Sequence, residues 1–110
     1  DEIFLSGLTA GATATIGTTV NLQPELFLAL RSAFREGNIP RAQRVQQQIN
    51  DVVDTLIACG VFQSAKYLSG KGLIDAGPVR EPFVPLNPGQ KAELDTLHLR
   101  LQGYIAQAGQ

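Results

Sequence analysis

A single strand-like segment limits which folds are open to this chain. Residues 12–21, ATATIGTTVN, carry no charge and are rich in β-branched side chains. Such a composition is typical of a strand buried on both faces of a parallel sheet. No other segment predicts a strand, and a lone strand has nothing to pair with its backbone groups. With helix signals on both sides, the segment indicates one period of an alternating α/β protein.

Apolar residues recur at helical spacing through most of the remaining sequence. A short helix is expected over residues 2–10, and a second begins near Pro24 and ends before Gly37. The clearest amphipathic pattern runs over residues 38–60, and a shorter helix is expected within residues 61–72. The pattern therefore predicts a mostly helical chain.

A proline-rich connector separates these helices from the last one. Four prolines fall between Pro78 and Pro88, which predicts extended backbone. Asn87 is then placed to cap a final helix, with Pro88 at its first position and Gln90 three residues on, as in a capping box.

Composition excludes several classes of protein. The chain has 110 residues, 44% of them hydrophobic and 17% charged, which fits one small globular domain. Its formal net charge is −1 with no basic stripe, so neither nucleic acid nor an acidic membrane is expected as a partner. No apolar run is long enough to span a membrane, and the one cysteine, Cys59, cannot form a disulfide framework. A cytoplasmic protein without a metal site is expected.

Three stretches resemble the N-acetylneuraminate lyase branch of the dihydrodipicolinate synthase family: DEIFLSGLTAGATATIGTTVN, REGNIPRAQRVQQQINDVVDTLIACGVFQSAKYL and GLIDAGPVREPFVPL. The resemblance implies a C-terminal fragment of a (β/α)8 TIM barrel. Residues 1–37 would be the last part of the barrel (helix 7, strand 8 and helix 8), and residues 38–110 a helical C-terminal extension. A barrel needs about 250 residues, so the chain is expected to be part of a longer protein. The intact protein is expected to be a homotetramer.

Members of this family cleave or form a carbon–carbon bond next to pyruvate through a Schiff base on a lysine. The resemblance places that lysine on the sixth strand, before this sequence begins. No catalytic residue is therefore assigned within the chain, and Lys66, Lys71 and Lys91 are not taken as the nucleophile. No cofactor is expected, and the 110-residue chain alone is expected to be inactive.

The resemblance also implies part of a substrate site. Asp1 and Glu2 match an acidic pair that binds the hydroxyl groups of the sugar acid, Gly17 and Thr18 match a Gly-Ser pair at the end of the eighth strand, and Phe62 matches an aromatic at the mouth of the pocket. From the residues alone, other roles stay open. Asp1 and Glu2 could cap a helix, Gly17 and Thr18 could be ordinary strand residues, and Phe62 could serve packing.

Three functions therefore remain as hypotheses. The first is part of a lyase of the N-acetylneuraminate type, acting on a sugar acid. The second is part of a related dihydrodipicolinate synthase or 2-keto-3-deoxy sugar acid aldolase. The third is a non-catalytic helical module that works through protein contacts.

Overall fold

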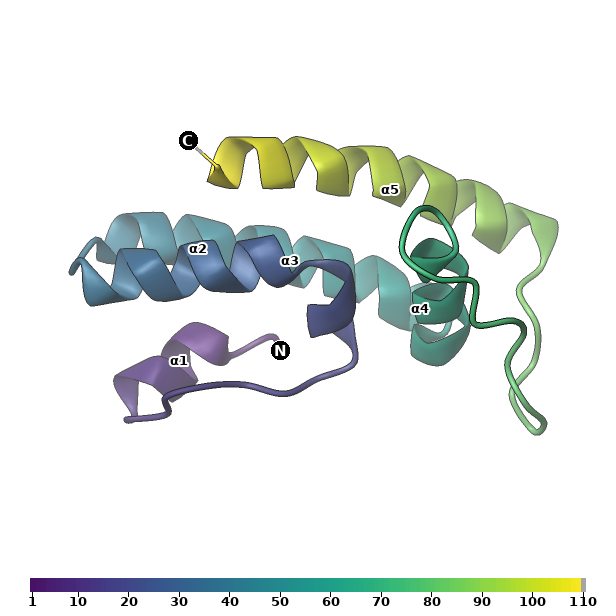
Figure 1. Ribbon diagram of the computed structural model, residues 1–110, viewed down its shortest axis with the longest axis horizontal. Helices are drawn as coiled ribbons and strands as arrows, with labels where there is room; N and C mark the ends of the chain where they lie inside the picture. Colours follow the sequence, from purple (N-terminus) through teal and green to yellow (C-terminus); the bar gives the residue numbers. More distant parts are fainter. Residues whose placement is uncertain (110) are drawn as a thin grey trace.

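The computed structural model describes residues 1–109, which form a helical bundle (Figure 1). Helices α2 and α3 are antiparallel neighbours, and α5 runs along them. Helix α4 continues from the end of α3 and contacts α5 and the 3-10 turn η1, while α1 lies against α2 and α3. The elements in chain order are α1 (Phe4–Thr9), η1 (Thr19–Leu22), α2 (Pro24–Arg35), α3 (Ile39–Cys59), α4 (Val61–Ser69) and α5 (Pro88–Ala108).

The strand expected over residues 12–21 is wrong. Residues 12–17 are irregular, η1 begins at Thr19, and residues 1–109 contain no strand. No backbone hydrogen bond joins residues 13–17 to any other described residue. A strand exists only as part of a ladder, and this chain offers no second segment to complete one. The expected assignment of helix 7, an eighth barrel strand and helix 8 therefore does not describe this structure, which is helical.

The helix bounds follow from local signals. Pro24 occupies the first turn of α2, where its missing N–H costs no hydrogen bond. The Asn38 side chain caps α3 by accepting a hydrogen bond from the Arg41 N–H at 3.2 Å. Gly60 ends α3 with a φ of 99°, a conformation that residues with a Cβ rarely adopt. Sequence signals therefore fix where α2 and α3 start and where α3 stops.

One hydrophobic core joins the helices. It lies between α2, α3 and α5 and extends to α1 and α4. The boundary expected between residues 37 and 38 stays a prediction, although α2 and α3, on either side of it, pack against each other. The largest apolar side chains that are fully buried are Leu26, Leu30, Ile49, Leu56, Leu94, Leu97 and Val52.

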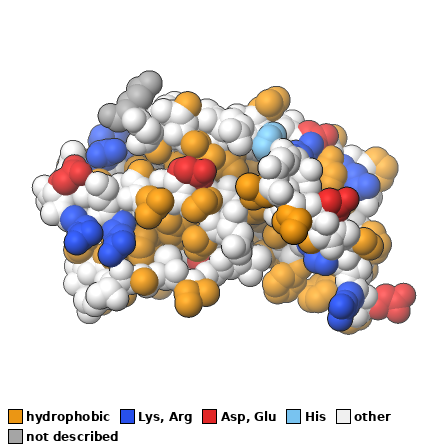
Figure 2. Space-filling model, viewed as in Figure 1, with side chains coloured by type: hydrophobic (Ala, Val, Ile, Leu, Met, Phe, Trp, Pro, Cys, Tyr) orange, Lys and Arg blue, Asp and Glu red, His pale blue; other side chains and the backbone are white. Residues whose placement is uncertain are grey.

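Several large apolar side chains lie on the surface instead (Figure 2). Ile16, within the irregular segment 12–17, is fully exposed, and Ile3 is 72% exposed. Within residues 1–109, no helix combines the length and the apolar character needed to cross a bilayer.

The expected capping box at the start of α5 is present, and it makes a testable contribution to stability. The Asn87 side chain accepts from the Gln90 N–H at 2.8 Å, and the Gln90 side chain accepts from the Asn87 N–H at 2.9 Å. We expect Asn87→Ala to lower the free energy of unfolding by about 1 kcal/mol, measured by urea denaturation. Asn87→Asp keeps the acceptor and should lose much less, whereas equal losses in both variants would contradict a capping role.

Candidate functional site

Asp1 lies against the segment around Gly17 in the folded chain. Asp1 Oδ2 accepts hydrogen bonds from the Thr19 N–H at 3.2 Å and from the Thr19 hydroxyl. A Cβ at Gly17 would overlap with the Asp1 carboxylate. Only glycine therefore lets the carboxylate lie this close to the backbone at position 17. Thr18, which was expected to supply a hydroxyl, directly precedes η1, and the bond to Asp1 comes from Thr19.

The two expected acidic residues differ in exposure. The Asp1 side chain is 11% exposed, whereas that of Glu2 is 50% exposed. A hydrogen bond from the backbone lowers the pKa of the Glu2 carboxyl below its usual value. Glu2 is therefore an ionised, accessible acceptor at neutral pH. Neither residue caps α1, because Ile3 holds the capping position and no side chain bonds there.

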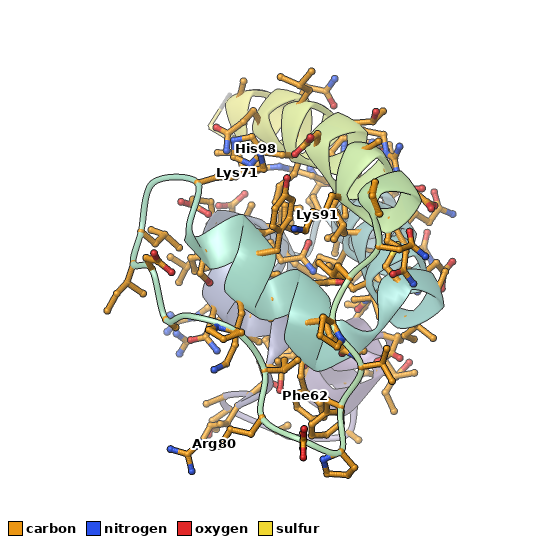
Figure 3. All side chains as sticks on the ribbon, turned by 90° about the vertical axis from the view of Figure 1, so that its right-hand side faces the viewer. Phe62, Lys71, Arg80, Lys91 and His98 are labelled. Atoms are coloured by element: carbon orange, nitrogen blue, oxygen red, sulfur yellow. The ribbon has the colours of Figure 1, made fainter. Side chains whose placement is uncertain are left out.

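Phe62 and Asp1 have different contact partners. It is on α4, 49% exposed, and its ring packs edge-on against Phe83 with the centroids 5.1 Å apart. In the view of Figure 3, Phe62 and Arg80 lie on the lower side of the molecule, and Lys71 and His98 on the upper side. The structure therefore assembles Asp1, Gly17 and Thr19, and gives Phe62 an aromatic packing partner elsewhere.

Two side chains of α3, Gln46 and Asn50, hold the N-terminal residues in place. Gln46 donates to the Asp1 carbonyl at 3.2 Å and accepts from the Leu5 N–H at 2.9 Å. Asn50 donates to the Glu2 carbonyl at 3.2 Å and accepts from Gln46 at 2.8 Å. This network holds the backbone of the acidic pair and of Leu5.

Sequence reasoning missed Gln46, Asn50 and Thr19. Gln46 and Asn50 fall in QQQIN, where adjacent amides give no indication of which side chain faces another segment. Their spacing of four residues places them on one face of α3 and was the only available signal. Thr19 stood next to the predicted pair but was taken as a strand residue.

The Gln46 network predicts a local effect on residues 1–5. We expect Gln46→Ala to speed hydrogen exchange at the Leu5 amide by about tenfold, because a partly buried N–H loses its acceptor. The neighbouring Gln47→Ala removes the same side chain from an exposed position and should leave that rate unchanged. Exchange at Leu5 that is identical in the two variants would contradict the network.

The three lysines have partners that do not favour a nucleophilic amine. Lys66 Nζ donates to the Pro78 carbonyl at 3.1 Å, and Lys91 Nζ lies 6.0 Å from the centre of the Tyr67 ring. Lys71 Nζ pairs with the Asp95 carboxylate at 2.6 Å, and this hydrogen bond raises the pKa of Lys71. Schiff-base lysines need the opposite shift, toward the neutral amine.

The surroundings of the Cys59 thiol indicate a structural role for this side chain. Cys59 is buried at the end of α3, and burial, with the Glu93 carboxylate 3.6 Å from its sulfur, raises the pKa of the thiol. Across the described part of the chain, no group of three or more His, Cys, Asp or Glu side chains could hold a metal ion.

Comparison with known sequences identifies related proteins. Residues 1–99 match the Dihydrodipicolinate synthetase family. An N-acetylneuraminate lyase of Enterobacter sp. (strain 638) is 40% identical over 102 residues, which cover 92% of this chain and 34% of that protein. An N-acetylneuraminate lyase of Salmonella typhimurium is 41% identical over 88 residues, covering 79% of this chain and 30% of that protein. The chain thus spans about a third of the length of these relatives.

Solved structures of similar proteins come from the same two kinds of enzyme. N-acetylneuraminate lyase of Proteus mirabilis matches with a TM-score of 0.85 and 27% identity, over 92% of this chain and 34% of that one. A dihydrodipicolinate synthase of Bacillus anthracis matches with a TM-score of 0.80 and 25% identity, over 90% of this chain and 34% of that one. The helical arrangement in Figure 1 is therefore shared with both enzymes.

Proposed function

Because this chain belongs to the dihydrodipicolinate synthetase family, we propose that it contributes part of the substrate site of a lyase that cleaves a sugar acid of the N-acetylneuraminate type and releases pyruvate. The names of the related proteins support a lyase or aldolase activity for the family. The substrate assignment follows the Enterobacter and Salmonella relatives at about 40% identity, both named N-acetylneuraminate lyase.

The observation that carries the proposal is the position of Asp1 against Gly17 and Thr19. Asp1 Oδ2 accepts hydrogen bonds from Thr19, and these bonds hold the turn that leads into Glu2 in one conformation. Ionised carboxylates only accept hydrogen bonds, which suits the recognition of sugar hydroxyl groups. In this proposal Asp1 orients the turn and offers its second oxygen, Oδ1, while the exposed Glu2 carboxylate binds a further hydroxyl.

The nucleophilic amine is proposed to come from outside residues 1–110. Lys71 is held as a cation by Asp95, and Lys66 donates to the carbonyls of Ala76 and Pro78. Neither arrangement favours the neutral amine that attacks a ketone. Without such an amine, the 110-residue chain is expected to form no Schiff base. The homotetramer that the resemblance implies stays a prediction.

A second candidate is a dihydrodipicolinate synthase or a 2-keto-3-deoxy sugar acid aldolase. The structural similarity to the Bacillus anthracis synthase, with a TM-score of 0.80, favours keeping it. All of these enzymes share the pyruvate half of the reaction, so only the second substrate separates them. Assaying the native gene product with N-acetylneuraminate, with aspartate semialdehyde plus pyruvate, and with a 2-keto-3-deoxy sugar acid distinguishes the candidates.

The decisive experiment traps the Schiff base. The native gene product that contains these residues is incubated with pyruvate and borohydride, and its denatured mass is measured beside that of the 110-residue chain. We expect a reduced pyruvate adduct on the former and none on the latter. An adduct on the 110-residue chain would contradict the assignment of the lysines, and no adduct on either protein would contradict the lyase.

A further inference from the structure

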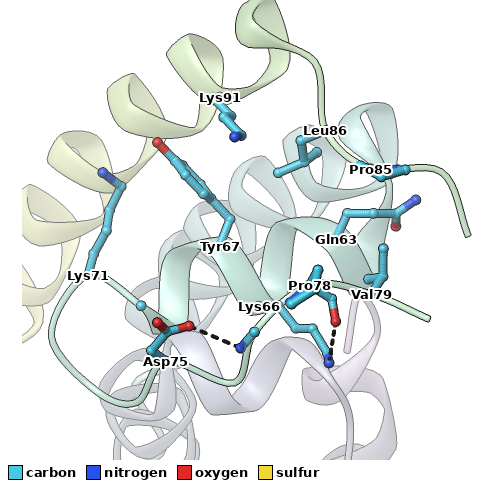
Figure 4. Close-up of a pocket in the computed structure, with 12 residues that line it drawn as sticks. Gln63, Lys66, Tyr67, Lys71, Asp75, Pro78, Val79, Pro85, Leu86 and Lys91 are labelled. Carbon is cyan, nitrogen blue, oxygen red and sulfur yellow. Dashed lines mark hydrogen bonds between the residues drawn. The ribbon is translucent and has the colours of Figure 1, made fainter.

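A pocket of about 380 Å³ lies between α4, the connector after it and the start of α5 (Figure 4). It shares no residue with the group formed by Asp1, Gly17 and Thr19. Its volume is within the range of sites that bind small molecules. The connector closes one side, and Lys66 of α4 fixes it there through its bonds to the carbonyls of Ala76 and Pro78.

Positive charge dominates the lining of the pocket. Lys66, Lys71 and Lys91 face a single lining carboxylate, Asp75. Lys71 is already paired with Asp95, whereas Lys66 and Lys91 have no carboxylate within 4.0 Å among residues 1–109. Asp75 uses one oxygen to accept the Gly77 N–H at 3.0 Å, which leaves the other free to accept. Lys66 is already engaged by the Ala76 and Pro78 carbonyls, so the pocket offers a ligand the Lys91 cation and the Asp75 acceptor.

Part of the pocket wall is apolar. Val79, Leu86 and the Tyr67 ring supply apolar surface, and Pro78 and Pro85 have no N–H to donate. Phosphate sites in proteins commonly add arginine or a helix N-terminus to lysine, and no arginine lines this pocket. A bare inorganic anion would lose hydration here with few donors in exchange.

We propose that this pocket binds a small organic carboxylate with a flat apolar body and a hydroxyl group. Its carboxylate lies beside Lys91, its apolar body contacts the Tyr67 ring and Leu86, and its hydroxyl donates to Asp75. Lys91 already lies 6.0 Å from the centre of the Tyr67 ring, so the cation and the apolar surface are adjacent. An anion beside Lys91 would therefore touch both.

The test uses 4-hydroxybenzoate as the probe and the 110-residue chain with labelled tyrosines. The chain has two tyrosines, so Tyr104, outside the pocket, serves as the internal reference for Tyr67. We expect the Tyr67 ring signals to shift and saturate with a Kd near 1 mM, an affinity of about 4.1 kcal/mol. Benzamide, which has no charge, and inorganic phosphate, which has no apolar body, should each bind at least about fivefold more weakly.

Lys91→Gln should weaken 4-hydroxybenzoate about fivefold, because it removes an unpaired cation from the pocket. The matched control is Arg35→Gln, which removes the same charge from an exposed position in the last turn of α2 and should leave binding unchanged. The proposal is overturned if Tyr67 does not shift, if Tyr104 shifts as much, if benzamide or phosphate binds as tightly, or if Lys91→Gln binds like the unmodified chain.

Discussion

Leu97→Ala is expected to lower the free energy of unfolding by about 3 kcal/mol. Leu97 is fully buried in the core that α5 shares with α2 and α3. Truncation removes apolar contacts and leaves a cavity that rigid helices on three sides cannot fill. Urea denaturation followed by circular dichroism at a fixed protein concentration gives the change directly.

Leu99→Ala is the matched control for this prediction. Leu99 lies on the same helix two residues away, but its side chain is 73% exposed. The same atoms are removed with the same change in helix propensity, so the loss should stay below about 0.5 kcal/mol. If both variants lost similar stability, α5 would not be packed against α2 and α3 as described.

Gly17→Ala is expected to reduce kcat/KM for cleavage of the sugar acid by between about 10-fold and 100-fold. The new Cβ would overlap with the Asp1 carboxylate and force it away from Thr19. Hydrogen bonds to a charged group contribute about 1.5–3 kcal/mol, which corresponds to that range of rates. The measurement is a pyruvate-release assay on the native gene product, and it rests on the proposed function.

Gly103→Ala controls for the substitution itself. Gly103 is on α5, and nothing lies within 4 Å of the Cβ that alanine would add. Alanine is a better helix former than glycine, so this variant should be slightly more stable and equally active. Full activity in Gly17→Ala, with the Asp1–Thr19 hydrogen bond lost, would remove Asp1 from the site.

Most of the helical structure could be predicted from local patterns. The apolar spacing from residue 38 to residue 60 predicted α3, and the structure has it from Ile39 to Cys59. The capping box at Asn87 predicted the start of α5. These predictions succeeded because a helix satisfies its backbone within itself, so its signals lie within a few residues of one another.

The strand prediction failed for the complementary reason. β-branched residues in ATATIGTT favour extended backbone, but a strand needs a neighbour that no local composition supplies. The residues became an irregular segment with Ile16 fully exposed. Propensity alone could not supply the pairing that a strand needs.

The candidate site was only partly accessible to sequence reasoning. Resemblance brought Asp1 and Gly17 into one hypothesis, and the structure brings them into contact. The partner that holds Asp1 is Thr19, and the side chains that hold the backbone are Gln46 and Asn50. Those contacts cross more than forty residues of sequence in the case of Gln46 and Asn50, which no periodicity encodes.

The Gln46 and Asn50 network has a consequence for the order in which this chain acquires its structure. Helices α2 and α3 are joined by a short turn at residues 36–38, so their contacts close small loops and form early. Asp1 and Glu2 are synthesised before all of them, yet their backbone is held by side chains 45 and 48 positions later. Asp1 and Glu2 therefore reach their native positions only after the α2–α3 hairpin has folded and placed Gln46 and Asn50.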